Sequence, residues 1–82
     1  MIVLDGNVMD GREATHAELK RKFDLPDYYG NNLDALNDCL GERTERELVV
    51  IEDAGAFLEA DGAYGALLLR VFTENGLQVL LD

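Results

Sequence analysis

The chain has 82 residues, of which 17 are Asp or Glu and only 7 are Lys or Arg, so its formal net charge is -10. Direct binding to nucleic acid is therefore not expected, because affinity for phosphate comes mainly from Lys and Arg. A hydrophobic content of 48% is ordinary for a globular protein, so the acidity does not indicate disorder. The length predicts a single domain over residues 1–82.

Composition excludes further classes of protein. The chain has no serine, so it is not a carrier protein that holds a phosphopantetheine arm on a serine. No apolar run approaches the roughly 18 residues of a membrane span. The run Met1–Leu4 stops at Asp5 without the basic start or cleavage site of a signal peptide. Cys39 is the only cysteine, so no internal disulfide can form and a reducing, cytoplasmic location is expected.

The first predicted elements are a strand and a helix. The apolar run Ile2–Leu4 predicts the strand. Thr15 and Glu18 have the spacing of a capping box, which places them at the start of the helix. The basic residues 20–22 fall in its last turn, where positive charge complements the helix dipole, and we expect them to be solvated.

A short second helix follows a break in the chain. Pro26 and Gly30 mark the break, and Asn32 is a good N-cap residue. The pattern predicts a helix from Asn32 through Leu40 that is closed by Gly41.

The second predicted strand is the run Leu48–Ile51. Because this run is apolar at every position, it indicates a strand buried on both faces of a parallel sheet. Asp53 is expected to cap a brief helical turn that contains Phe57 and Leu58.

A longer helix begins at Asp61 and ends at Asn75–Gly76, and its apolar residues repeat at helical spacing. The run Leu77–Leu81 predicts a third strand. The order of elements predicts an α/β fold, with a small three-stranded parallel sheet packed against about four helices.

The segment Phe23–Glu42 contains five acidic residues and no Lys or Arg, so it carries half of the net charge. Asp34 and Asp38 lie four residues apart and project from one face of the second helix, away from its apolar face. Asp38 is opposed both by the helix dipole and by Asp34, at a cost of a few tenths of a kcal/mol each. This suggests a functional site; the alternative is an ordinary hydrated face.

The stretch Leu25–Leu40, which reads LPDYYGNNLDALNDCL, closely resembles the barstar family of small intracellular inhibitors of secreted barnase-type ribonucleases. The similarity extends upstream through Lys20, Leu19 and His16, and the order of strands and helices fits the family over the full chain. The resemblance implies that the second helix and the loop before it plug the active site of a nuclease.

The resemblance also implies roles for individual residues. The carboxylate of Asp38 would occupy the place of a substrate phosphate, and Asp34 would pair with a basic residue of the enzyme. Tyr28 matches an aromatic residue that packs on the catalytic His, and Glu74 matches a peripheral acidic contact. The remaining positions that match the same contact surface are Gly30, Asn32 and Leu33.

The sequence departs from the family pattern at Asn37, where a Trp is common, and in residues 41–44, where an aromatic residue is expected. Trp is a favoured interface anchor, so Asn37 is a partner-facing position that affects the choice of partner. The target is then a barnase-type ribonuclease, a different ribonuclease, or a toxin with another cationic site.

Other residues with reactive side chains have structural interpretations. Cys39 lies on the apolar face of its helix and is expected to be buried. His16 is expected to be structural or capping, because one imidazole cannot form a zinc site. Tyr29 and Tyr64 are expected in the core, and no calcium-loop spacing is present, so no metal or cofactor is predicted.

We therefore expect a non-enzymatic, stoichiometric ribonuclease inhibitor that is monomeric when free. One alternative is an acidic adaptor, or an immunity protein for a basic toxin that is not a ribonuclease. A second alternative is a small enzyme that uses Cys39, His16 or the pair Asp34 and Asp38.

Overall fold

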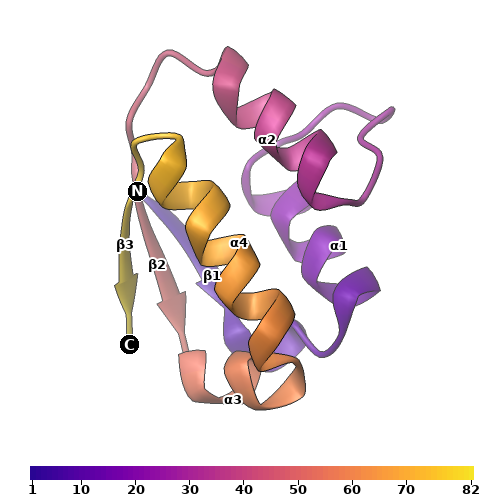
Figure 1. The fold of residues 1–82 in the computed structure, drawn as a ribbon, viewed down its shortest axis with the longest axis vertical. Coiled ribbons are helices and arrows are strands. Elements are labelled where there is room, and N and C mark those ends of the chain that lie inside the picture. Colours follow the sequence, from indigo (N-terminus) through magenta and orange to yellow (C-terminus); the bar gives the residue numbers. More distant parts are fainter.

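The computed structural model describes residues 1–82 and contains four helices and three strands (Figure 1). In chain order the elements are β1 (Ile2–Asp5), the 3-10 turn η1 (Gly6–Val8), α1 (Arg12–Lys22), α2 (Leu33–Glu42), β2 (Leu48–Glu52), α3 (Ala54–Ala60), α4 (Gly62–Glu74) and β3 (Gln78–Leu81). The predicted α/β fold is confirmed, although the third strand begins at Gln78 and not at Leu77. None of the helices combines the length and the apolar character needed to cross a bilayer.

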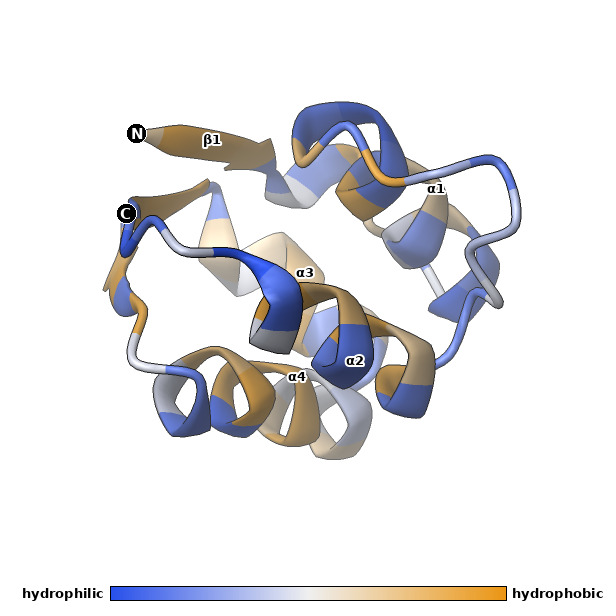
Figure 2. Ribbon diagram, turned by 90° about the horizontal axis from the view of Figure 1, so that it is seen from above, coloured by the Kyte–Doolittle hydropathy of each residue, from blue (hydrophilic) through white to orange (hydrophobic).

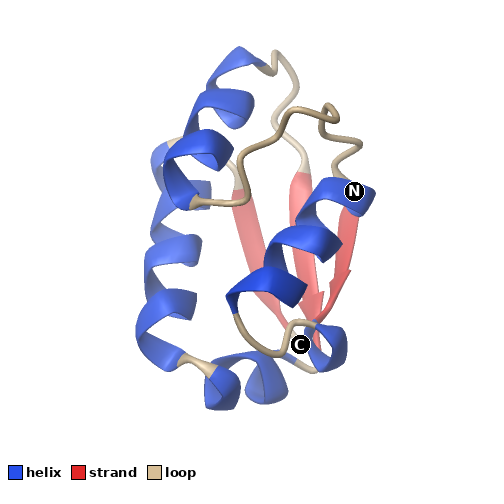
Figure 3. Cartoon of the chain, turned by 90° about the vertical axis from the view of Figure 1, so that its right-hand side faces the viewer, coloured by secondary structure: helices blue, strands red, loops and turns tan.

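The three strands are parallel and lie in the order β1-β2-β3, with Val3 opposite Val50 and Val50 opposite Leu80. Parallel crossovers are almost always right-handed, so two crossovers that advance in the same direction place their helices on the same face. Figures 1 and 3 show this arrangement, with α1, α2 and α4 on one side of the sheet.

This one-sided covering corrects the prediction for β2. Val49 and Ile51 are fully buried beneath the helices, whereas Leu48 and Val50 point to the other face and are only partly buried. The continuous apolar run therefore did not indicate burial on both faces, because no helix covers the second face.

The core fills the space between the sheet and the helices. Phe23 and Phe72 stack with their ring centroids 5.9 Å apart and join the end of α1 to α4. Phe57, Phe72 and Tyr29 are buried, as predicted. Tyr64 is only half-buried, because its hydroxyl lies at the edge of the core.

The start of α1 differs from the prediction. The helix begins at Arg12 after Gly11, whose φ of 93° is readily adopted only by glycine. Thr15 and His16 therefore lie inside the helix, and the Thr15 hydroxyl donates to the Gly11 carbonyl at 2.7 Å. The predicted capping box was wrong.

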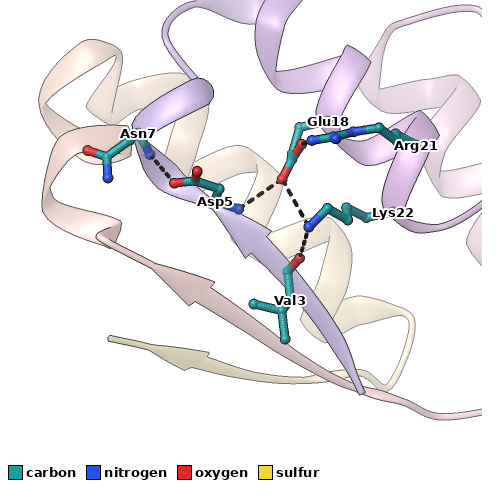
Figure 4. Close-up of polar contacts among 6 residues, drawn as sticks. All are labelled: Val3, Asp5, Asn7, Glu18, Arg21 and Lys22. Atoms are coloured by element: carbon teal, nitrogen blue, oxygen red, sulfur yellow. Dashed lines mark hydrogen bonds and ion pairs between the residues drawn. The ribbon is translucent and has the colours of Figure 1, made fainter.

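Glu18 instead turns inward and joins α1 to β1 (Figure 4). Its side chain is 1% exposed and accepts a hydrogen bond from the backbone N–H of Asp5 at 2.9 Å. Arg21 donates to the same carboxylate, and the Lys22 ammonium lies 3.7 Å from it and donates to the carbonyl of Val3 at 3.1 Å. The basic residues 20–22 lie in the last turn of α1 as predicted, and Arg21 and Lys22 are exposed, but these two side chains also pair with Glu18.

The remaining helix ends are set by side-chain and backbone geometry. Asp61 caps α4 as predicted, accepting from the N–H of Tyr64 at 3.0 Å. Asp53 precedes α3 in the left-handed region (φ 52°) but makes no capping bond, because its carboxylate accepts from the Asn7 amide at 2.6 Å. Helix α2 continues through Gly41 to Glu42, two residues beyond the predicted end.

Candidate protein-binding surface

The loop before α2, residues 24–32, is termed the binding loop. Asp24 and Asn31 stand near its two ends in the left-handed region, with φ values of 53° and 54°. The N–H of Tyr29 donates to the carbonyl of Pro26 at 2.9 Å and closes a turn. Tyr28 points outward and is 84% exposed, whereas the adjacent Tyr29 points inward and is 5% exposed.

The inward tyrosine reaches a buried histidine. Tyr29 and Tyr64 each place their hydroxyl on one ring nitrogen of His16, at 2.6 Å from Nδ1 and 2.5 Å from Nε2. Burial raises the pKa of Tyr29 and lowers the pKa of His16, so both groups are neutral at pH 7. His16 thus has a structural position, in the middle of α1 and not at its cap.

Asn32 fastens the binding loop to α2. Its Oδ1 accepts from the N–H of Ala35 at 2.7 Å, which confirms the predicted N-cap, and its Nδ2 donates to the carbonyl of Gly30 at 3.2 Å. Leu33 is half-buried against the core, and Gly30 is exposed. The side-chain oxygen and nitrogen of Asn32 therefore each make one hydrogen bond inside the chain.

The outer side of α2 carries an acidic face, defined by Asp34, Asp38 and Glu42, which are spaced four residues apart and exposed. None of the chain's six ion pairs involves these carboxylates, and the last turn of α2 contains no basic residue. In Figure 2, blue and orange alternate along α2, and the loop before it is blue to pale. Sequence reasoning missed Glu42 as a site residue because it ended the helix too early.

A depression of about 240 Å³ separates the binding loop from α2. Its lining residues are Tyr28, Tyr29, Gly30, Ala35, Asp38, Cys39 and Glu42. One side is aromatic and the other carries two carboxylates, a combination that suits a cationic side chain.

Cys39 lies in the same depression and is half-buried, not fully buried as expected. Burial raises the pKa of the Cys39 thiol, and the nearby carboxylates of Glu42 and Asp38 raise it further. The sulfur is therefore a neutral thiol at pH 7, which does not favour a nucleophilic role.

The orientation of Asn37 is fixed by Asn75, at the end of α4. The Asn75 Nδ2 donates to the carbonyl of Val71 at 2.8 Å and to Oδ1 of Asn37 at 2.8 Å. Because a backbone carbonyl can only accept, the Asn75 amide nitrogen must face Val71 and Asn37. Asn37 therefore turns its oxygen toward Asn75 and its NH₂ group away from it.

Glu74 precedes Asn75 and so lies at the end of α4 that borders Asn37. Its side chain is 58% exposed, and its carboxylate accepts from Nε of Arg70 at 2.7 Å. The structure thus brings Glu74 to the edge of the surface, but with its charge already paired.

Two other observations bear on the chemistry of the molecule. No group of three or more His, Cys, Asp or Glu side chains is arranged to hold a metal ion. A second, more open hollow of about 330 Å³ lies beyond α2 and is lined by residues 42–45, none of which is hydrophobic.

Comparison with known proteins identifies the family. The family model described as Barstar (barnase inhibitor) matches residues 1–79. A protein of Bacillus subtilis (strain 168) named "Putative ribonuclease inhibitor YrdF" is 40% identical over 77 residues, which cover 89% of this chain and 81% of that protein. Since the family model spans nearly the whole sequence, this chain belongs to the Barstar family.

Proposed function

We propose that the chain is a stoichiometric protein inhibitor of a ribonuclease and that α2 and the binding loop occlude the enzyme's cationic active site. Membership of the Barstar family supports ribonuclease inhibition in general. The observation that carries the proposed mechanism is the acidic face, whose carboxylates are exposed and have no cationic partner within the chain.

The chemistry follows from what a ribonuclease must bind. Its active site holds a phosphodiester with Arg, Lys or His side chains, and a carboxylate accepts the same charge-assisted hydrogen bonds as a phosphate oxygen. Asp38 borders the depression beside Tyr28, so one enzyme side chain can contact both the carboxylate and the aromatic ring. Asp34 offers a second carboxylate one helical turn away.

The position of these charges makes little sense for stability alone. Asp38 and Glu42 lie toward the carboxyl end of α2, where the helix dipole disfavours negative charge by about 0.3–1 kcal/mol for each group. Asp34 and Asp38, and Asp38 and Glu42, also repel each other at i,i+4 spacing. A cationic partner would offset these unfavourable terms with attractive charge pairs.

The remaining proposed contact residues lie around the acidic face. Gly30 and Leu33 lie on the loop and the first turn of α2, and Asn32 holds that geometry from within. Asn37 turns its oxygen toward the end of α4 and leaves its NH₂ group free for a partner, and Glu74 supplies a peripheral carboxylate at that end of α4.

The direct test is a titration of purified barnase activity with the purified chain. We expect activity to fall linearly to an end point at one inhibitor per enzyme. The matched control replaces the acidic face by isosteric amides, Asp34→Asn, Asp38→Asn and Glu42→Gln, which should inhibit far more weakly while melting at least as high as the parent. Equal inhibition by this variant would refute the mechanism.

The alternative partner is a basic toxin that is not a ribonuclease, and it is favoured by one observation, the amide of Asn37 in place of an aromatic anchor. Two results together would establish this alternative. The protein would leave barnase fully active even at large molar excess, and it would bind a basic toxin that is not a ribonuclease through the acidic face.

A further inference from the structure

We propose that His16 and Tyr64 are positioning residues, which hold the binding loop in its inhibitory conformation through a directed hydrogen-bond chain to Tyr29. The three residues come from α1, α4 and the binding loop, and the two hydrogen bonds of the chain measure 2.6 Å and 2.5 Å. The inference rests on the proposed function, because the loop is assigned to inhibition there.

The direction of the chain follows from burial. A neutral imidazole has one donor and one acceptor nitrogen. The Tyr29 hydroxyl is buried and has Nδ1 of His16 as its partner, so its proton must point to that nitrogen. Nε2 then carries the ring proton and donates it to the Tyr64 hydroxyl.

The last proton to place is that of the Tyr64 hydroxyl. Because Tyr64 is half-buried, its hydroxyl can donate this proton outward to water. In this arrangement no buried side-chain nitrogen or oxygen lacks a partner. With the opposite tautomer, Nδ1 would donate to Tyr29 and leave the Tyr29 hydroxyl proton buried without an acceptor, which is costly. The structure therefore assigns the Nε2–H tautomer to His16.

The hydrogen bonds among Tyr29, His16 and Tyr64 act on the binding surface through the backbone of the loop. Tyr29 lies between Tyr28 and Gly30, so fixing the tip of its ring restrains both neighbours. At the other end, the Arg12 guanidinium lies 4.4 Å from the centre of the Tyr64 ring and 3.6 Å from the carboxylate of Asp61. The loop is thus connected to two helices by its one buried tyrosine.

A restrained loop matters because a partner binds only the fraction of molecules that are already competent. Loss of either tyrosine hydroxyl should therefore lower the competent fraction without removing any atom that touches the partner.

The first test uses the free chain. Nitrogen NMR of the His16 ring should show a pyridine-type Nδ1 and a pyrrole-type Nε2, and the opposite assignment would overturn the directed chain. Hydrogen exchange at the Tyr29 N–H should accelerate in Tyr29→Phe and Tyr64→Phe. It should be unchanged in the control Val79→Ala, a destabilising variant that removes core packing from the edge strand β3, away from the binding loop (Figure 1).

The second test measures inhibition of barnase by the same variants, at a temperature where all are fully folded. Tyr29→Phe and Tyr64→Phe should inhibit about 2- to 10-fold more weakly than Val79→Ala, the range of one net hydrogen bond. Equal inhibition by the three variants would mean that the Tyr29–His16–Tyr64 hydrogen bonds are merely structural, and it would overturn the proposal. If the parent itself fails to inhibit barnase, the proposed function fails, and the exchange and NMR results still decide whether the loop is held as stated.

Discussion

The buried carboxylate of Glu18 provides a sharp test of how the helical layer is attached to the sheet. It accepts from the Asp5 N–H in β1 and pairs with Arg21 and Lys22, and Lys22 in turn donates to the carbonyl of Val3 (Figure 4). The informative variants are Glu18→Gln, which keeps an acceptor but removes the charge, and Glu18→Ala, which removes both.

The expected losses follow from these contacts. A hydrogen bond to a charged group contributes about 1.5–3 kcal/mol and a neutral one about 0.5–1.5 kcal/mol, so Glu18→Gln should cost about 1–2 kcal/mol. Glu18→Ala also leaves the part-buried Asp5 N–H without an acceptor and should cost about 3 kcal/mol. For a chain of this size each kcal/mol lowers the melting temperature by about 4–8 °C.

The pH dependence of unfolding gives a second, independent readout. Burial raises the pKa of Glu18, but the Asp5 N–H and the Arg21 side chain outweigh it, so the pKa lies below its ordinary value of 4.5. The stabilisation is therefore present above pH 4.5 and is lost as the pH falls through the lowered pKa. Glu18→Gln should lack this part of the acid sensitivity.

Thermal melts followed by circular dichroism at pH 7 and pH 3 supply both numbers. The matched control is Glu13→Gln, an exposed carboxylate in the first turn of the same helix, whose neutralisation should cost only its interaction with the helix dipole, about 0.3–1 kcal/mol. If Glu18→Ala melts at pH 7 as high as the Glu13 control, the carboxylate does not fasten α1 to β1 and the reasoning is wrong.

Three further outcomes are expected. Because burial lowers the pKa of His16 below 6.5, the unfolded state binds more protons, so the melting temperature should fall as the pH drops below 6.5; a His16→Gln variant should lack this step. Association with barnase should slow markedly as the Debye length falls from about 30 Å at 0.01 M salt to about 8 Å at 0.15 M, as in the known barnase–barstar case, and stopped-flow rates independent of salt would refute steering. Asn37→Trp should tighten inhibition of barnase by restoring an aromatic contact, whereas weaker inhibition would indicate a partner shaped for the amide.

The fold was predictable wherever a local signal determined the structure. Asn32 and Asp61 cap their helices as expected, because an N-cap bond spans only three residues. The three apolar runs became the strands of a parallel sheet, because their spacing leaves room for helical crossovers.

The errors arose where distant residues decide the outcome. Glu18 matches a capping box locally, but a strand 13 residues away supplies the donor that holds it. Likewise, the apolar run of β2 could not reveal that both crossovers would leave one face of the sheet without helices. Helix α2 passes through Gly41, which does not adopt the left-handed conformation that a terminal glycine allows.

The candidate binding surface was predictable in part for the same reason. The spacing of Asp34 and Asp38 placed both on one side of α2, and the correct end of the helix adds Glu42 to that row. The link between Asn37 and Asn75 spans 38 residues, and the contact of His16 with Tyr64 spans 48, so neither left a local pattern in the sequence.

The most direct test of the central claim is the inhibition of barnase by Asp38→Ala, compared with Glu59→Ala, which removes an exposed charge from α3. Asp38→Ala should melt at the same temperature as the parent or slightly higher, because the helix dipole and Asp34 disfavour its charge. It should nevertheless inhibit at least about 30-fold to several thousand-fold more weakly, because truncating one partner of a buried interfacial charge pair typically costs about 2–5 kcal/mol or more. Glu59→Ala should inhibit like the parent. An Asp38→Ala variant that melts earlier yet inhibits as well as the parent would contradict the account.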